Sequence, residues 1–300
     1  MRPLRSLVLY LLAVLLLGAL LAPGLHGLVD WAGHHLPLLA PLADGPFHRV
    51  VNRSLLLVAI LGLWPLLRSL NIRSWDGVGL VRPAGQWPRL VAGFATGFGS
   101  LAVVALLALA AGAHRLAIDA HWAASLLTAA LSAGVVAVVE EVLFRGALFG
   151  ALRQAHHWLV ALVVSSGLYA LVHFFQRSPS SGPVTWSSGF ATLGQMFRGF
   201  VEFEVLVPGF FTLTLAGLIL GLAYHRTGNL YFSIGLHAGW IFWLKSYAVL
   251  TDAQPAAHLW LWGGARLMDG WLAFVTLGAM LGVMAAFLRS PEGTRLDQTS

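Results

Sequence analysis

The stretch Val139-Glu140-Glu141-Val142-Leu143-Phe144-Arg145 places two carboxylates and an arginine at the end of an apolar run, Ala123 to Val139. That run is long enough to cross most of a bilayer. Charged side chains at membrane depth are costly, so they are rare and are usually paired or functional. The stretch therefore predicts a membrane helix that carries a polar site.

The two glutamates are predicted to differ in role. Adjacent helix positions point about 100° apart, so both cannot share one partner. Glu141 and Arg145 stand at i and i+4 in the favourable acid-then-base order, which indicates a structural ion pair. Glu140 faces another side of the helix, where its sequence neighbours offer no cation. A carboxylate at such a place needs a partner from another helix, a water-filled cavity or a proton.

Composition identifies a polytopic membrane protein. Of 300 residues, 58% are hydrophobic and only 10% are charged, which excludes an ordinary soluble globule. The absence of cysteine excludes disulfides and thiolate metal sites. The net charge of +6 comes from arginines and one lysine, Lys245. We interpret it as loop charge that sets membrane topology, and we expect no nucleic-acid partner.

The predicted fold is an all-α membrane helix bundle with about eight transmembrane helices. The segment from Gln176 to Glu204 is predicted to be an interfacial loop or a short amphipathic helix, and the chain ends in a polar tail. A loop is expected from Pro23 to about Val50. The predicted spans are Ser6–Leu25, Ser54–Leu67, Leu90–Ala113, Ala123–Ala151, Trp158–Phe175, Val205–Tyr224, Leu230–Ala248 and Gly270–Leu288.

An even number of spans puts both termini on one side of the membrane. Arginines are more numerous in the segments on the side of the N-terminus, chiefly because of the loop from Arg68 to Arg89. By the positive-inside rule we expect both termini to be cytoplasmic, in a cell (plasma) membrane.

Depth along the helices brings three titratable side chains toward one place. The fourth and fifth spans form a hairpin that turns near residues 154–157. Glu140 and His173 lie about 21 and 24 Å from that turn at about 1.5 Å per residue, so they stand at similar depth. His237 is also buried along its span. Glu140, His173 and His237 are therefore predicted to meet in one intramembrane cavity.

These residues resemble a known family. Glu140-Glu141-x-x-x-Arg145 resembles the EExxxR motif of the CPBP family, the CAAX proteases and bacteriocin-processing enzymes. Tyr169-Ala-Leu-Val-His173 is similar to the second motif, FxxxH, with tyrosine in place of phenylalanine. The resemblance covers roughly residues 123–248.

A third motif of the family ends in a histidine, which the stretch from Gly228 to His237 resembles. The family often has asparagine four residues later, where this chain has Ile241. The resemblance implies that this asparagine and His237 stabilise the oxyanion of a peptidase reaction. An isoleucine side chain cannot donate a hydrogen bond, and the loss of one oxyanion donor can lower the rate by ~10²–10³. Either His237 or a backbone amide suffices, or catalysis here is slow or lost.

The resemblance implies an intramembrane endopeptidase that hydrolyses peptide bonds in peptide or membrane-protein substrates. It implies that Glu140 and His173 activate a water and that His237 stabilises the oxyanion, with Glu141, Arg145 and Tyr169 in support. By this comparison residues 123–250 are the catalytic core, residues 1–122 hold the first three helices, and residues 251–300 hold the last helix and the tail. Whether prenylated CAAX proteins are cleaved stays open.

Alternatives of cofactor and function also stay open. Glu140, His173 and His237 could hold zinc with an open fourth position, or act in a metal-free Glu/His mechanism. A catalytically silent family member, acting as a scaffold or immunity factor, is supported by Ile241. A proton-coupled transporter would use the same side chains as a relay, but we find no internal repeat of the kind transporters often show.

Overall fold

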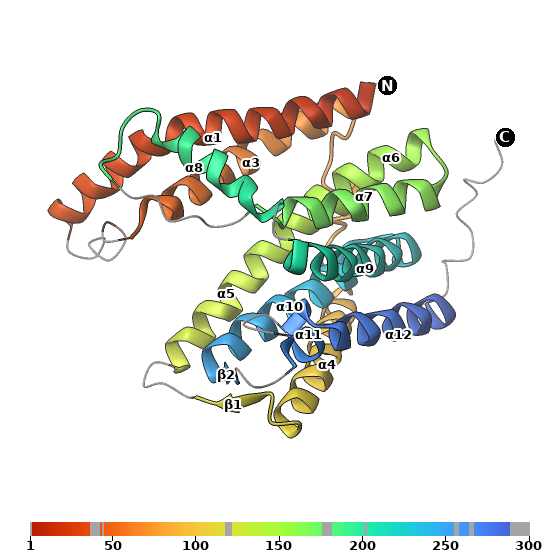
Figure 1. Ribbon diagram of the computed structural model, residues 1–300. Helices are drawn as coiled ribbons and strands as arrows, with labels where there is room; N and C mark the ends of the chain where they lie inside the picture. Colours follow the sequence, from red (N-terminus) through yellow and green to blue (C-terminus); the bar gives the residue numbers. More distant parts are fainter. Residues whose placement is uncertain are drawn as a thin grey trace. The chain divides into compact units, whose positions relative to one another are not determined.

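The computed structural model describes residues 2–36, 43, 45–117, 122–175, 182–200, 203–254, 258–263 and 267–288 (Figure 1). The polar tail predicted beyond Leu288 lies outside these residues, as do Arg177 and Arg266 of the predicted loops. The chain divides into two compact units. Unit 1 comprises Met1–Arg73 and Leu171–Leu206, and unit 2 comprises Ser74–Ala170 and Val207–Ser300.

The protein is an all-α membrane-type helix bundle, as predicted. Each predicted span corresponds to a helix or to one continuous helical run. Within the described residues, five of these are long and apolar enough to cross a membrane. They are α1 (Arg2–His35), α3 (Phe47–Ser69), α4 (Trp87–Ala110), the run of α5 (Trp122–Glu141), η3 (Val142–Phe149) and α6 (Gly150–Ala155), and α9 (Phe203–Thr227).

Three further helices complete the set of predicted spans. These are α7 (Trp158–Val172), α10 (Tyr231–Leu250) and α12 (Trp271–Phe287). Large apolar side chains stay exposed on outer faces, such as Leu61 at 67% and Leu131 at 65%. An apolar exterior of this kind suits lipid rather than water. The chain is thus a multi-pass membrane protein.

The first loop prediction was wrong for much of its length. α1 continues through Pro23 to His35, although a loop was expected from Pro23 to Val50. α3 begins at Phe47, so it is longer than the predicted span from Ser54. Proline breaks helices in water, but membrane helices tolerate it because neighbouring groups re-satisfy the freed backbone. The proline signal was therefore misleading in an apolar segment.

Unit 1 is built on the pairing of α1 and α3, which a short helix covers. Ser54 Oγ donates to the Gly18 carbonyl at 2.7 Å and ties the two helices together. The short helix is α8 (Ser188–Met196), followed by one 3-10 turn, η4 (Phe197–Phe200). α8 approaches α1 closely at Gly189, because a Cβ there would lie 1.9 Å from the Ala19 carbonyl oxygen. The predicted short helix between 176 and 204 is confirmed.

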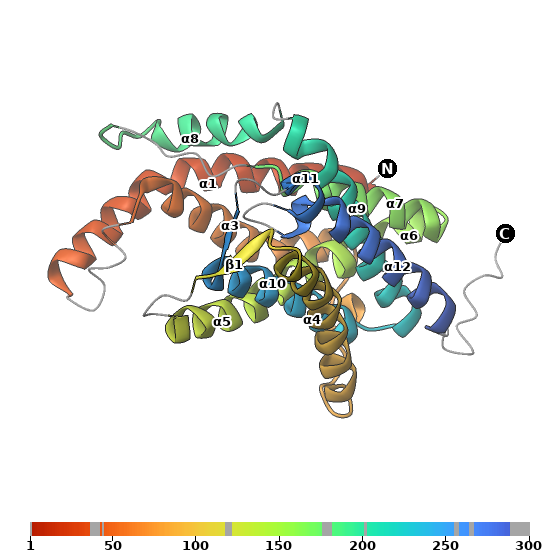
Figure 2. The same cartoon turned by 60° about the horizontal axis from the view of Figure 1, so that its bottom comes forward.

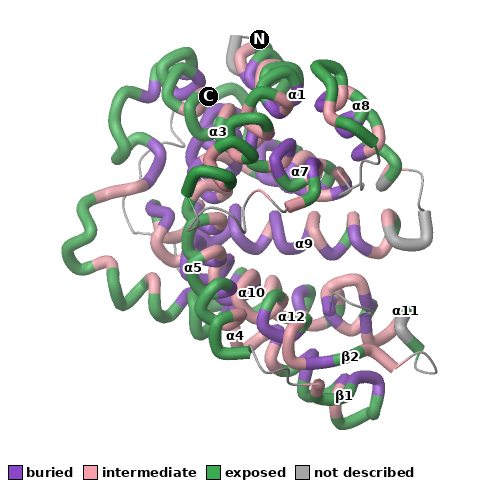
Figure 3. Tube along the Cα trace, turned by 90° about the vertical axis from the view of Figure 1, so that its left-hand side faces the viewer, coloured by how far each residue is buried: buried purple, intermediate pink, exposed green. Residues whose placement is uncertain are grey.

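Unit 2 packs its helices closely through glycines. Added Cβ atoms on α4 at Gly93 and Gly97, or on α10 at Gly235 and Gly239, would run into the backbone of the other helix. Small residues of this kind let membrane helices touch backbone to backbone. Figure 2 shows α4 crossing α10, and Figure 3 shows buried positions recurring along α9. Among the latter, Ile219 and Leu220 are fully buried.

A short β-ribbon joins the ends of α4 and α10, which the all-α prediction did not include. β1 (His114–Leu116) pairs antiparallel with β2 (Thr251–Ala253). His114 of this ribbon is buried, with Nε2 3.1 Å from the Gly263 carbonyl oxygen and its ring beside Tyr247. Pairing of two distant segments is invisible to local sequence patterns. The remaining short elements are η2 (Asp76–Val78), α11 (Leu259–Trp262) and η5 (Leu267–Asp269).

Candidate active site

The helix that carries the Glu-Glu motif changes its winding immediately after the motif. α5 ends at Glu141, and the next eight residues, Val142–Phe149, form the π-helical segment η3. π-helical turns are rare and occur mostly at functional sites. The predicted hairpin turn is confirmed, because α6 ends at Ala155 and α7 starts at Trp158. The π-helical winding was missed, and no periodicity in the sequence signals it.

Gly146 of η3 permits a close approach by the loop before α4. A Cβ at Gly146 would lie 2.8 Å from both Cβ and the carbonyl oxygen of Val78, which belongs to η2. Cβ atoms do not make contacts this short in folded proteins, so a larger residue at position 146 would displace η2. The π-helical segment η3 therefore packs closely against η2, which lies in the loop before α4.

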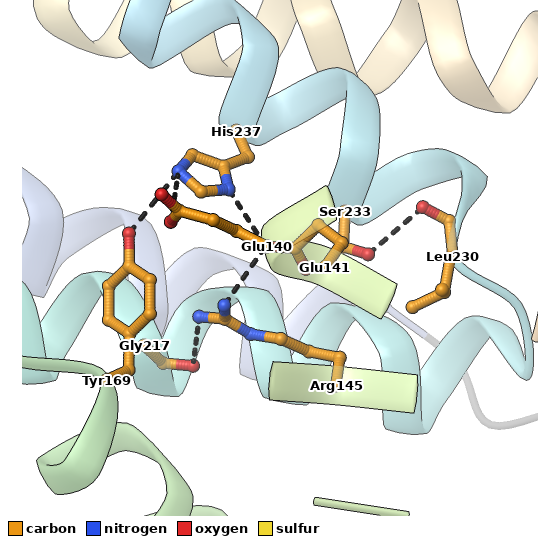
Figure 4. A network of polar contacts seen from close by, with 8 residues as sticks. All are labelled: Glu140, Glu141, Arg145, Tyr169, Gly217, Leu230, Ser233 and His237. Atoms are coloured by element: carbon orange, nitrogen blue, oxygen red, sulfur yellow. Dashed lines mark hydrogen bonds and ion pairs between the residues drawn. The ribbon is translucent and has the colours of Figure 1, made fainter. Parts of the chain in front are cut away.

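Glu141 is the centre of a buried network in unit 2. Its side chain is fully buried, and its Oε1 atom lies 3.0 Å from Nη1 of Arg145 and 2.9 Å from Nδ1 of His237 (Figure 4). The predicted i,i+4 pair with Arg145 is confirmed. The expectation that the two glutamates cannot share one partner was wrong, because Glu141 lies 2.9 Å from Nδ1 of His237 and Glu140 lies 3.8 Å from Nε2 of the same ring. The Glu141 Oε1 atom thus combines an ion pair with Arg145 and a hydrogen bond with His237, which approach it from different sides.

These contacts fix the tautomer of His237. Glu141 lies against a guanidinium, so it is present as a carboxylate and can only accept hydrogen bonds. Nδ1 of His237 must then carry the proton that it donates to Oε1 at 2.9 Å. The opposite nitrogen, Nε2, points to the rest of the site.

Arg145 is held on several sides. Nη2 lies 3.5 Å from the Gly217 carbonyl oxygen of α9, and the guanidinium carbon lies 4.4 Å from the centre of the Tyr169 ring. A buried cation is costly unless charged and polar groups surround it. Arg145 thus links Glu141 of α5 to Gly217 of α9 and to the Tyr169 ring of α7.

Glu140 faces the other nitrogen of His237. Its Oε2 atom lies 3.8 Å from Nε2. The Glu140 side chain is 25% exposed, whereas that of Glu141 is fully buried. Of the two adjacent carboxylates, Glu140 is therefore the more exposed, although its Oε2 atom is itself buried. Figure 4 shows Glu140 and Glu141 approaching the His237 ring from its two nitrogen sides.

Tyr169 completes the ring of contacts around His237. Its hydroxyl lies 3.3 Å from Nε2, and it comes from α7, the helix that follows the hairpin turn. The tyrosine ring also meets Phe144 edge-on, with centroids 5.1 Å apart. The position where the family's motif has phenylalanine thus carries a hydroxyl aimed at the histidine. Sequence comparison alone gave no partner for that hydroxyl.

His173 lies just beyond α7 rather than inside it. The helix ends at Val172, and His173 begins a turn, half-buried. The predicted span through Phe175 was therefore too long at this end. His173 belongs to unit 1, whereas Glu140 and His237 belong to unit 2. Their convergence stays a prediction.

The predicted zinc ligands do not form a complete set within the described residues. No group of three or more histidine, aspartate or glutamate side chains there is arranged to hold a metal ion. Catalytic zinc sites use three protein ligands and one open position. Glu140 and His237 supply two donors, fewer than that set.

Ile241 stands one turn beyond His237 on α10 and is half-buried. It occupies the register at which the resembling family often has a donor. Its effect on catalysis stays a prediction.

Comparison with known proteins points to one family. Residues 120–243 match the family model described as type II CAAX prenyl endopeptidase Rce1-like. The match contains the Glu-Glu motif, both candidate histidines and Tyr169, and it confirms the resemblance inferred from these motifs. The search of curated proteins and the search of solved structures found no match.

Proposed function

We propose that this chain, which belongs to the CPBP family of CAAX-protease-like membrane proteins, hydrolyses peptide bonds within the membrane by a Glu/His mechanism. The observation that carries the proposal is the pairing of Glu140, whose side chain is partly exposed, with the buried His237. A partly exposed carboxylate lies 3.8 Å from one nitrogen of an imidazole, and the other nitrogen contacts the fully buried Glu141. This arrangement resembles a general base beside a positioned imidazole.

Glu140 acts as the base in the proposed reaction. Its carboxylate takes a proton from a water while the water oxygen bonds to the peptide carbonyl carbon. The carbonyl oxygen becomes an oxyanion in the tetrahedral intermediate. When the C–N bond breaks, protonated Glu140 returns the proton to the leaving nitrogen, so the reaction yields a carboxylic acid and an amine.

His237 acts on the developing charge. Its Nδ1–H is committed to Glu141, and a carboxylate in that position stabilises an imidazolium, as the aspartate does in serine-protease triads. In the proposed reaction His237 is protonated at both nitrogens from the start, so Nε2–H donates to the oxyanion and that proton stays on the ring throughout the cycle. Tyr169 lies 3.3 Å from the same nitrogen and limits how the ring can turn. Glu141 and Arg145 are positioning residues, since they reach the reaction only through His237.

His173 is proposed to share the orientation of the attacking water with Glu140. A double-mutant cycle tests this in the full chain in detergent, with mass-spectrometric detection of cleaved decapeptides. Glu140→Gln, His173→Ala and the double variant should each reduce the rate to a similar low level, because residues that act as a unit are not additive. His156→Ala, at the exposed hairpin turn, is the matched control. Independent, additive losses would reject the shared role.

One observation favours a silent family member acting as scaffold or immunity factor. Ile241 supplies no donor where the family often has asparagine. A wild-type chain that cleaves none of the decapeptides, while it folds and melts cooperatively, would support that reading. Cleavage that Glu140→Gln abolishes would exclude it.

The proposed orientation has both termini cytoplasmic in the cell membrane. It rests on the excess of arginine in the segments on that side. Reporter fusions after Arg82 and after Arg295 should both give cytoplasmic signals. A signal from the far side at either point would overturn the orientation without affecting the proposed chemistry.

A further inference from the structure

An arginine outside the network around Glu141 lies at the hairpin turn of unit 2. Arg153 stands in the last turn of α6 and is exposed. Its guanidinium carbon lies 5.6 Å from the centre of the Phe149 ring and 5.2 Å from the centre of the Tyr224 ring. Both rings belong to buried residues, so two fixed aromatic side chains hold an exposed cation in one place.

The Arg153 guanidinium keeps its hydrogen-bonding capacity. Among the residues that the structure describes, it makes no hydrogen bond and no ion pair, and its contacts are the two aromatic rings. Residues 142–170 and 205–250, which form the helices around it, contain no aspartate or glutamate. An arginine presents five N–H donors in a planar fork that matches the oxygens of a carboxylate or a phosphate. The fork therefore fits an anion that comes from outside these helices.

The surroundings of Arg153 are typical of a membrane interface. The turn after α6 carries His156 and His157, both exposed, and α7 begins at Trp158. The Trp158 ring stacks on the ring of His225, near the end of α9, with centroids 4.4 Å apart. Tryptophan and tyrosine are enriched where the hydrocarbon core of a bilayer meets the headgroups. We therefore expect this end of the helices to lie at the level of the lipid headgroups.

An apolar outer face begins directly beyond the turn. Leu159, Val160 and Val163 lie on one side of α7 and are exposed. Leu159 follows Arg153 by only six residues, across a short turn. A lipid whose phosphate lies at Arg153 can place its acyl chains along this face, whereas a free phosphate ion gains nothing from it. The combination favours a lipid as the source of the anion.

We propose that Arg153, held on the rings of Phe149 and Tyr224, binds the phosphate of an anionic phospholipid headgroup. Two N–H groups of the guanidinium donate to two phosphate oxygens in a charge-assisted pair. Basic sites between membrane helices on the cytoplasmic side bind lipid headgroups, and the proposed orientation puts this turn on that side. The inference does not depend on the proposed peptidase activity, because it uses no residue of the site around Glu140.

The test measures the binding of phosphatidylglycerol to the full chain in detergent by native mass spectrometry. Wild type should bind this lipid more tightly than phosphatidylcholine, whose choline cation offsets the charge of its phosphate. Arg153→Gln should raise the dissociation constant for phosphatidylglycerol by about tenfold or more, the contribution of one charge-assisted hydrogen bond. Arg153→Lys keeps the charge without the planar fork, so its dissociation constant should lie between the two.

Arg82→Gln is the matched control. Arg82 is an exposed arginine of the same unit, and within the described part of the chain it contacts no aromatic ring. Its loss should raise the dissociation constant by less than about fivefold, the contribution of one arginine near an anionic membrane surface. Melting curves verify that each variant is folded.

The outcomes separate a lipid site from ordinary loop charge. If Arg153→Gln weakens binding no more than Arg82→Gln does, the site is overturned and Arg153 serves only to set topology. Equal binding of phosphatidylglycerol and phosphatidylcholine would reject the preference for an anion. Excess inorganic phosphate should leave phosphatidylglycerol bound. If it displaces the lipid as effectively as added phosphatidylglycerol does, the ligand is a phosphate ion and the lipid assignment fails.

Discussion

α5 and α10 are joined at two levels by polar contacts of opposite character. At the inner level, Glu141 is fully buried and faces Arg145 and His237 at 3.0 and 2.9 Å. At the outer level, Lys245 meets Ser132 at an exposed edge. The same two helices thus share a buried network of charged side chains and an exposed contact between a lysine and a neutral serine.

The difference in burial predicts that the two contacts contribute differently to stability. Breaking a buried ion pair leaves an uncompensated charge in a low dielectric, so the inner network contributes to folding and to orientation. An exposed contact of this kind contributes little to stability. Glu140 belongs to the inner level but is 25% exposed, so it is the more accessible of the two carboxylates there.

Loss of Glu140 should give the largest effect on rate. Glu140→Gln removes the proposed base and keeps the side-chain volume, so peptide cleavage should fall by ~10²–10⁴. Its melting temperature in detergent should stay close to that of wild type. A strongly lowered melting temperature would mean that Glu140, and not only Glu141, supports the fold.

Loss of Glu141 should give the largest effect on stability. Glu141→Gln leaves Arg145 buried without its carboxylate and weakens the anchor of His237, at a cost of about 3–5 kcal/mol. Yield and melting temperature should both drop. A cleavage rate per folded molecule that stays at the wild-type level would disprove the positioning role through His237.

A substitution at Ile241 tests whether the site around His237 lacks a hydrogen-bond donor to the oxyanion. Ile241→Asn adds an amide one turn from His237, so any measured cleavage rate should rise, by about tenfold or more if the amide reaches the oxyanion. Ile241→Leu is the control for a change of shape alone. An unchanged rate in Ile241→Asn would indicate that His237 or a backbone amide already suffices.

Tyr169 should have a smaller effect. Tyr169→Phe removes the hydroxyl 3.3 Å from Nε2 of His237 and keeps the ring that covers Arg145. One neutral hydrogen bond contributes about 0.5–1.5 kcal/mol, and denaturation in detergent should show a loss of that size. Because the family's motif has phenylalanine here, the variant should fold. A loss several times larger would place Tyr169 among the residues essential to the buried network.

The outer contact should matter least for stability. Ser132→Ala removes the hydroxyl at the exposed edge, and its free energy of unfolding should change by no more than about 0.5 kcal/mol. Thermal melts of this variant and of Glu141→Gln, run side by side, compare the two levels directly. Equal losses would contradict the distinction between them.

The sequence by itself determined the class of fold, the hairpin around residues 154–157, the pairing of Glu141 with Arg145 and the family. Each depends on local information: apolar length, i,i+4 spacing and short motifs. These signals are read correctly because a membrane helix satisfies its own backbone, so a span is recognised from its own residues.

Only the tertiary structure decided the rest. It brought His237 to Glu141, aimed the Tyr169 hydroxyl at the same ring, and paired Lys245 with Ser132 from helices far apart in the chain. It also wound η3 as a π-helix against η2 and carried α1 through Pro23. These features depend on which surfaces meet across the bundle, and side-chain partners from distant segments leave no periodic trace in a single sequence.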